Sequence, residues 1–141
     1  MPAGEYVLIS DYSAYFEISK DSTGELDSIL ANDNFINRSI ITVSDGQYVK
    51  LSGCTMYAFS AAPAVVITDG ILPEGMYKVG IDIDAGEYKV VPDLSGYVEV
   101  SKDSTHNTNS IISNDILSGE QYITIADGQY IKLSGAHLIT G

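Results

Sequence analysis

The chain has no tryptophan, a single cysteine, two histidines and only seven lysine or arginine residues among its 141. One cysteine excludes an intrachain disulfide bond and says nothing about the redox compartment. Because 19 residues are acidic, the formal net charge is −12. Such a charge repels the phosphates of nucleic acids and the anionic headgroups of lipids. We therefore predict no nucleic acid partner and no binding to an anionic membrane surface.

Long apolar runs are also missing. No apolar stretch reaches the roughly 18 residues that a transmembrane helix needs, so we predict no direct membrane insertion. Residues 1–5 lack the basic and apolar regions of a signal peptide. We expect Met1 to be an expression start and the native chain to continue upstream, where a signal or an anchor could lie.

The apolar residues alternate with polar ones, and no helical stripe is present. Phe16 and Ile18 alternate with Tyr15, Glu17 and Ser19, and the same alternation recurs at residues 97–101. An alternation of period two predicts strands whose two faces differ in polarity. The sequence therefore predicts an all-β fold.

A shift of 82 positions lays the chain over itself without a gap. Between residues 3–58 and 85–140, 27 of 56 positions are identical. This similarity indicates an internal duplication. A site that the unit needs should then occur twice, and a residue that occurs once is expected to be incidental.

Strands are predicted at regular spacing in both copies, and one turn can be assigned in detail. The apolar pattern favours a three-residue loop, Ser44–Gly46, that pairs Val43 with Gln47 and Ile41 with Val49. In that loop Gly46, like its counterpart Gly128, takes a positive φ. The predicted strands are 4–9, 14–20, 27–31, 39–43, 47–52 and 54–59 in the first copy, and 76–83, 86–91, 96–102, 109–113, 121–125, 129–133 and 136–140 in the second.

Short strands with one apolar face predict two tandem sandwich-like or jelly-roll-like units. We place the first unit at residues 1–62, a linker at 63–75 and the second unit at 76–141. The first unit lacks a counterpart of the strand that leads into the second, which leaves an open sheet edge. Dimerisation through that edge is therefore expected.

The residues that recur in both copies give little indication of a catalytic site. His106 lies opposite Gly24 and His137 opposite Thr55, so neither histidine recurs, and Cys54 corresponds to Ala136. Zinc-ligand spacing and a phosphate-binding glycine loop are both missing. We predict that the protein is not an enzyme.

A polar set does recur in both copies. Tyrosines offer flat contact area, and carboxylates can hold sugar hydroxyls or a peptide backbone. The same residue types also suit the wet side of any sheet, so a purely structural role stays open. The candidate ligand-binding residues are Tyr15, Glu17, Ser19, Tyr97, Glu99 and Ser101.

Calcium is the one cofactor that the repeat suggests, because hard oxygen donors on loops are its ligands. No calcium-binding loop motif is present, so the chain is otherwise expected to need no cofactor. The candidate metal ligands are Asp21, Asp33, Asp103 and Asp115.

Two motifs carry a resemblance to a known family. Residues 77–88 read Y-K-V-G-I-D-I-D-A-G-E-Y, and both copies end in D-G-Q-Y-x-K-L-S-G, at 45–53 and 127–135. The chain resembles poorly characterised tandem repeat domains of Gram-positive bacterial surface proteins and lipoproteins, whose V-G-x-D-I-P-A-G-E-Y motif keeps its proline here as Pro2 but not at Asp84. The resemblance implies an extracellular or cell-surface location and supplies no ligand. We expect a non-catalytic interaction module for an unknown glycan or protein; the alternatives are a structural spacer without a ligand site and, more remotely, a calcium-binding or glycan-processing domain.

Overall fold

The computed structural model of the chain describes residues 2–140, and these form two antiparallel sheets. The all-β prediction is confirmed, since the helical segments are 3₁₀ turns of three residues, at Leu26–Ser28, Phe59–Ala61 and Thr108–Ser110. The first sheet holds β1 (Gly4–Ser19), β2 (Ile29–Val43), β3 (Tyr48–Ser52) and β4 (Thr55–Ala58). The second sheet holds β5 (Ile71–Leu72), β6 (Gly75–Lys78), β7 (Gly86–Ser101), β8 (Ile111–Leu117), β9 (Gln121–Ile125) and β10 (Tyr130–Ile139).

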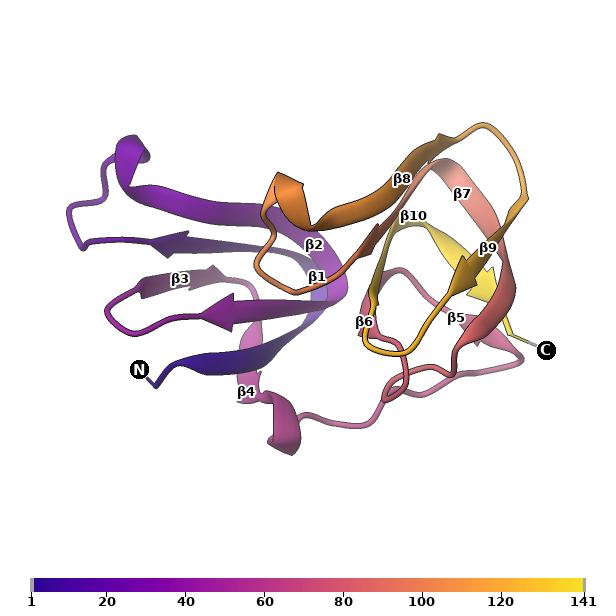
Figure 1. Cartoon of the computed structure of the whole chain (residues 1–141), viewed down its shortest axis with the longest axis horizontal. Coiled ribbons are helices and arrows are strands. Elements are labelled where there is room, and N and C mark those ends of the chain that lie inside the picture. Colours follow the sequence, from indigo (N-terminus) through magenta and orange to yellow (C-terminus); the bar gives the residue numbers. More distant parts are fainter. Residues whose placement is uncertain (1, 141) are drawn as a thin grey trace.

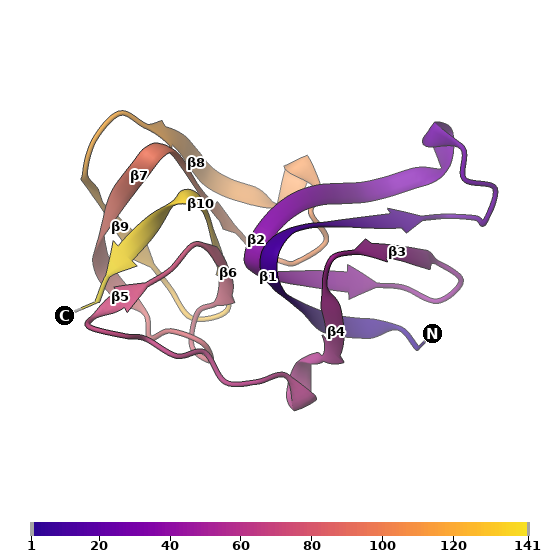
Figure 2. The same ribbon diagram turned by 180° about the vertical axis from the view of Figure 1, so that it is seen from behind.

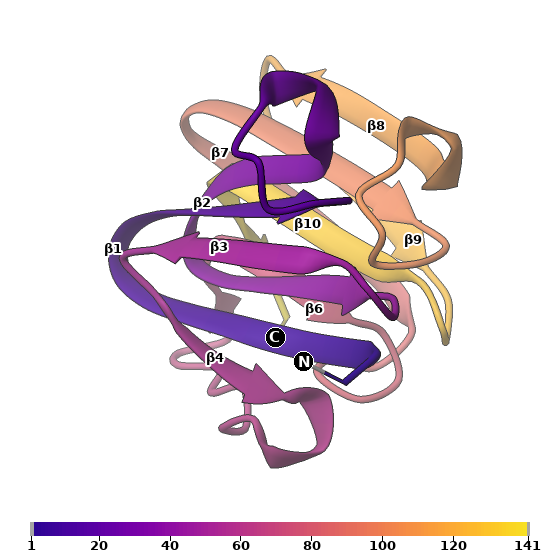
Figure 3. The ribbon, with the colours of Figure 1, turned by 90° about the vertical axis from the view of Figure 1, so that its left-hand side faces the viewer.

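The first sheet is built around β1, which bends near its middle (Figures 1 and 3). β2 pairs with β1 along both halves, and the ladder is interrupted between Ile9 and Ser13. On its other side β1 pairs with β4 through its first half and with β3 through its second. Gly53 lies between β3 and β4, where the chain follows this bend. Its φ of 75° suits glycine, and a Cβ there would lie 3.1 Å from the Ser13 carbonyl oxygen.

The bend brings the two halves of the first sheet face to face over one apolar core. Residues of alternating position along each strand point inward, as the sequence pattern predicts. The buried members of this core are Leu8, Ala14, Phe16, Ile18, Phe35, Ile41 and Val43.

The second sheet is built around β7 in the same way. β9 pairs with the first half of β7, β8 with its second half, and β10 with both halves on the other side. Residues that are 82 positions apart have equivalent pairing partners in the two sheets, since Glu17 lies opposite Lys50 and Glu99 lies opposite Lys132. One difference stands out. β5 and β6 add to the free side of β10 (Figure 2), whereas β3 has a hydrogen-bonded strand on one side only within residues 2–140.

The turn between β2 and β3 has the predicted glycine conformation but not the predicted pairing. Gly46 and Gly128 have φ values of 82° and 85°, which confirms the left-handed assignment. The predicted pairing of Val43 with Gln47 and of Ile41 with Val49 is wrong, because β2 and β3 both pair with β1. The turn instead crosses from one half of the bent sheet to the other. Ile41 and Val49 therefore contribute to the same core from opposite walls.

Two predicted boundaries also change. The predicted strand 76–83 is correct only as far as Lys78, because Gly80 with φ of 98° opens a turn in which the Asp82 amide donates to the Lys78 carbonyl at 2.9 Å. Pairing in the second sheet already begins at Ile71, inside the segment 63–75 that was predicted to be a linker.

The two sheets contact each other through a small apolar cluster and a surrounding set of polar contacts. β2 of the first sheet lies beside β6 of the second (Figures 1 and 2). The buried residues of this cluster are Val7, Ile40, Met76 and Tyr130.

Candidate functional site

The predicted ligand-binding residues of the first copy lie on the outer face of β1, because Phe16 and Ile18 occupy its core face. Their side chains form a hydrogen-bonded chain. The Tyr15 hydroxyl donates to Glu17 Oε1 at 3.0 Å, and the Ser19 hydroxyl donates to Glu17 Oε2 at 3.5 Å. From β2, the Asn32 amide donates to the Tyr15 hydroxyl at 3.1 Å. We name Tyr15, Glu17, Ser19 and Asn32 the first polar array.

The second copy forms the same arrangement on β7 and β8. The Tyr97 hydroxyl donates to Glu99 Oε1 at 2.8 Å, and the Ser101 hydroxyl donates to Glu99 Oε2 at 3.1 Å. The Asn114 amide donates to the Tyr97 hydroxyl at 3.2 Å. We name Tyr97, Glu99, Ser101 and Asn114 the second polar array. The structure thus groups the six candidate residues into two separate sets, and ligand binding by either set stays a prediction.

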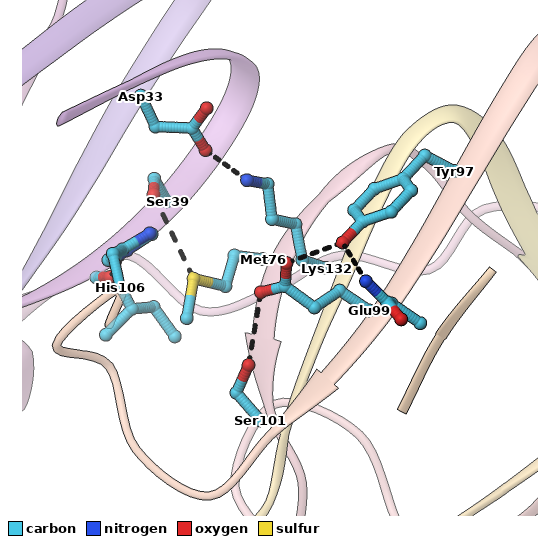
Figure 4. A network of polar contacts seen from close by, with 10 residues as sticks. Asp33, Ser39, Met76, Tyr97, Glu99, Ser101, His106 and Lys132 are labelled. Carbon is cyan, nitrogen blue, oxygen red and sulfur yellow. Dashed lines mark hydrogen bonds and ion pairs between the residues drawn. The ribbon is translucent and has the colours of Figure 1, made fainter. Parts of the chain in front are cut away.

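The surroundings of the second polar array come from the other sheet. Lys132 on β10 lies opposite Glu99 and forms an ion pair with Asp33 on β2, close to Tyr97 (Figure 4). Burial raises the pKa of Tyr97, and the negative charges of Glu99 and Asp33 act in the same direction. This array therefore faces protein, and β2 supplies the carboxylate that its neighbouring lysine binds.

A groove of about 200 Å³ runs between the sheets next to this contact, lined by residues of β2, β6 and β10. Arg38 and Lys132 bring positive charge to it, but each already has a carboxylate partner. Arg38 lies 3.7 Å from Asp82, with both side chains less than one tenth exposed. Within residues 2–140 the Arg38 Nε is the one buried side-chain donor without a hydrogen-bond partner.

Glu5 at the start of β1 is the centre of a second polar contact between the sheets. It accepts a hydrogen bond from the Ser104 hydroxyl at 2.7 Å and another from the Tyr130 hydroxyl. Lys78 lies 3.3 Å from its other oxygen. Burial raises the pKa of Tyr130, and the hydrogen bond to Glu5 adds to this effect.

Thr42 and His106 complete the contact between the sheets. The Thr42 amide donates to the Ser104 carbonyl at 3.0 Å, and the two hydroxyl groups lie 2.6 Å apart. His106 Nε2 lies 2.7 Å from the Ile40 carbonyl oxygen. Sequence reasoning did not select Glu5 or Thr42, and it set His106 aside because this histidine occurs in one copy alone. Glu5 and Thr42 each recur 82 positions on, so the repeat held a signal for them, whereas His106 gave none.

The four aspartates predicted as metal ligands do not form one cluster within residues 2–140. Asp21 accepts hydrogen bonds from the Thr23 hydroxyl at 2.7 Å and amide at 3.1 Å, and these bonds lower its pKa. Asp103 binds Thr105 in the same way. Asp33 pairs with Lys132, and Asp115 is exposed. The described part of the chain contains no group of three or more His, Cys, Asp or Glu side chains placed to hold a metal ion.

Comparison of the chain with models of protein families, with curated proteins and with solved structures found no match. The resemblance to Gram-positive surface repeats therefore stays a prediction. Over residues 2–140, none of the helical turns has the length and apolar character that crossing a membrane requires.

Proposed function

We propose that the chain is a non-catalytic interaction module of an extracellular or cell-surface protein, and that it recognises protein through the first polar array and the adjoining residues of β3. One observation carries this proposal. The second polar array already lies next to a protein surface, because Asp33 on β2 binds the lysine beside it. The repeated sequence, which we attribute to internal duplication, makes the first array and the exposed Lys50 opposite Glu17 the counterpart of that contact.

The exposure of β3 supports this reading. Tyr48 is 52% exposed, whereas Tyr130 at the corresponding position is 6% exposed between the sheets. Lys50 is exposed, whereas Lys132 is paired with Asp33. A flat aromatic ring beside an unshielded cation is a surface that a protein partner can bury with a carboxylate.

Protein is favoured over glycan as the ligand because the carboxylate of the array is already engaged. Both oxygens of Glu17 accept hydrogen bonds from neighbouring hydroxyl groups. A sugar hydroxyl would share these oxygens as a further donor and would exchange a bond to water for one to Glu17, with a net gain of only about 0.5–1.5 kcal/mol. The location outside the cytoplasm rests on the sequence resemblance.

Photo-crosslinking tests the proposal even though the partner is unidentified. Benzoylphenylalanine replaces Tyr48 in the full chain, which is irradiated with the cell-surface fraction of the producing bacterium. Tyr12, which is 81% exposed on the bend of β1, serves as the control position. We expect a protein adduct at position 48 that Lys50→Glu abolishes. Equal adducts at both positions, or specific retention on a glycan array with no protein adduct, would contradict the proposal.

A spacer without a ligand site is the second candidate, and the joint between the sheets favours it. The buried Arg38–Asp82 pair and the Glu5 contacts hold the sheets in one fixed arrangement. A spacer needs that rigidity and no exposed site. It predicts that no variant of Tyr48 or Lys50 changes any binding measurement.

A further inference from the structure

We propose that the partner of the first polar array is a second copy of this chain, which docks residues of β7, β8 and β9 of its second sheet on β3. This inference rests on the proposed function and names its partner. We define the head surface as Ser22, Tyr48 and Lys50, and the tail surface as Glu87, Asp115, Tyr122 and Thr124. The head surface of one copy binds the tail surface of the next.

The contact between the two sheets within one chain is the template. Among the polar contacts that cross it from the first sheet to the second, three pairs have both members repeated in the sequence. They are Asp33 with Lys132, Glu5 with Tyr130, and Thr42 with Ser104.

All six members of these pairs have an identical residue 82 positions away. Asp33, Glu5 and Thr42 correspond to Asp115, Glu87 and Thr124 on the second sheet, and Lys132, Tyr130 and Ser104 correspond to Lys50, Tyr48 and Ser22 on the first. All six counterparts are exposed or half-buried. The chain therefore carries both halves of these three pairs a second time on its surface.

Large side chains also differ in exposure between corresponding positions of the two sheets. Tyr122 is 66% exposed at the position that corresponds to Ile40, which is fully buried between the sheets. Tyr48 is likewise exposed at the position that corresponds to the buried Tyr130. Large side chains exposed where their counterparts are covered indicate a surface that a further sheet can cover.

The head and tail surfaces lie on different sheets, toward opposite ends of the molecule, so one chain cannot join its own two surfaces. In Figure 1 the loop that follows β1 and the strand β3 lie at one end, and β9 lies at the other. A contact between two different patches joins copies head to tail, and the copies add in an open row unless the rotation between them closes a ring.

The association between copies should be weaker than the internal contact. Met76 and Lys78 of β6 take part in the internal contact, and β3 has no such neighbouring strand within residues 2–140. Copies with a net charge of −12 also repel one another. At 0.15 M salt the screening length of about 8 Å weakens this repulsion and leaves contacting ion pairs largely intact.

Analytical ultracentrifugation of the full chain with a charge swap tests the inference. The variants are Lys50→Asp, Asp115→Lys and the two combined. Asp11→Lys is the control, because it changes the charge as Asp115→Lys does at an exposed site that belongs to neither surface. At concentrations up to about 1 mM, a range that detects weak contacts, the wild type and the control should rise at least about twofold above the single-chain mass without reaching a plateau.

Each single variant should stay near the mass of one 15.1 kDa chain, and the combined variant should regain the rise, because it restores opposite charges across the contact. Circular dichroism confirms that every variant is folded. A monomeric wild type, a dimer of fixed size, or association that Lys50→Asp leaves unchanged overturns the inference. If the wild type stays monomeric while position 48 crosslinks to a different protein, the proposed function stands and the self-docking fails.

Discussion

At the scale of single residues, position 106 is a point at which two loops of similar sequence differ. His106 and its counterpart Gly24 both have left-handed backbones, with φ values of 62° and 78°. Glycine adopts this region at no steric cost, whereas histidine does so at some expense. The histidine ring offsets this by contacts to the other sheet. Its Nε2 lies near the Ile40 carbonyl, and its ring packs edge-on to Phe16 with centroids 4.8 Å apart.

This histidine should make stability depend on pH. Burial holds the pKa of His106 below its usual 6.5, against the opposing effect of the Ile40 carbonyl. The unfolded chain therefore binds a proton at a higher pH than the folded chain, and the free energy of unfolding falls as the pH drops below 6.5. Urea unfolding between pH 8 and pH 5 measures this. His106→Gln should flatten the slope; equal slopes for His106→Gln and the wild type would refute the assignment.

Glycines in tight turns give a second prediction at this scale. Gly128 has φ of 85° and open space around its absent Cβ, so Gly128→Ala should cost about 1 kcal/mol through the backbone alone. Gly135→Ala should cost more, because its Cβ would also lie 2.6 Å from the Ser95 carbonyl oxygen. Gly119, which has no positive φ and no close neighbour, is the control and should tolerate alanine. Thermal melts rank the three variants, and equal melting temperatures would contradict this order.

At the scale of elements, the alternation of residues was sufficient to place the strands but not to pair them. The pattern at Ile41, Val43, Val49 and Leu51 predicted one shared apolar face, and these residues do share one core. A hairpin and a bent sheet both produce this pattern. The same side chains are buried whether the two strands are neighbours in one layer or lie in the two facing halves of a bent sheet. Only the bend of β1 decides between them, and it depends on contacts distant in sequence.

The candidate site was predictable to a similar depth. Period two placed Tyr15, Glu17 and Ser19 on one outer face, and the repeat located the second array. The sequence spacing of the residues could not predict the ion pair between Asp33 and Lys132, because the two residues come from different sheets. The sequence likewise could not show that Tyr130 and Lys132 are covered by the first sheet while Tyr48 and Lys50 are exposed.

The open side of β3 gives a prediction at this scale. β10 has strands on both sides, whereas β3 has β1 alone among the described residues, so half of its amides point to no strand. Amide hydrogen exchange measured by NMR at low protein concentration should therefore be faster for residues 48–51 than for residues 130–133. Residues 15–19, which pair on both sides, are the control. Equal protection of the two strands would mean that another segment covers β3.

At the scale of the whole molecule, one buried ion pair joins the two sheets. Arg38 comes from β2, and Asp82 comes from the turn after β6. The Arg38 guanidinium also donates to the Pro63 carbonyl at 3.0 Å, and the Lys78 amide donates to Asp82 at 2.9 Å. In the second copy Glu120 takes the place of Arg38, so this contact is specific to the joint.

Removing the arginine should therefore cost far more than removing an exposed partner of the same charge. Arg38→Ala leaves the Asp82 carboxylate buried without its cation, and breaking a buried pair in this way costs about 3–5 kcal/mol. Lys89→Ala breaks the exposed pair with Glu120 and should cost less than about 1 kcal/mol. Urea unfolding followed by circular dichroism compares the two. If Asp82→Asn in the Arg38→Ala background recovers much of the loss, the isolated charge is its cause; if Arg38→Ala and Lys89→Ala cost the same, the sheets are held by their apolar cluster and not by this pair.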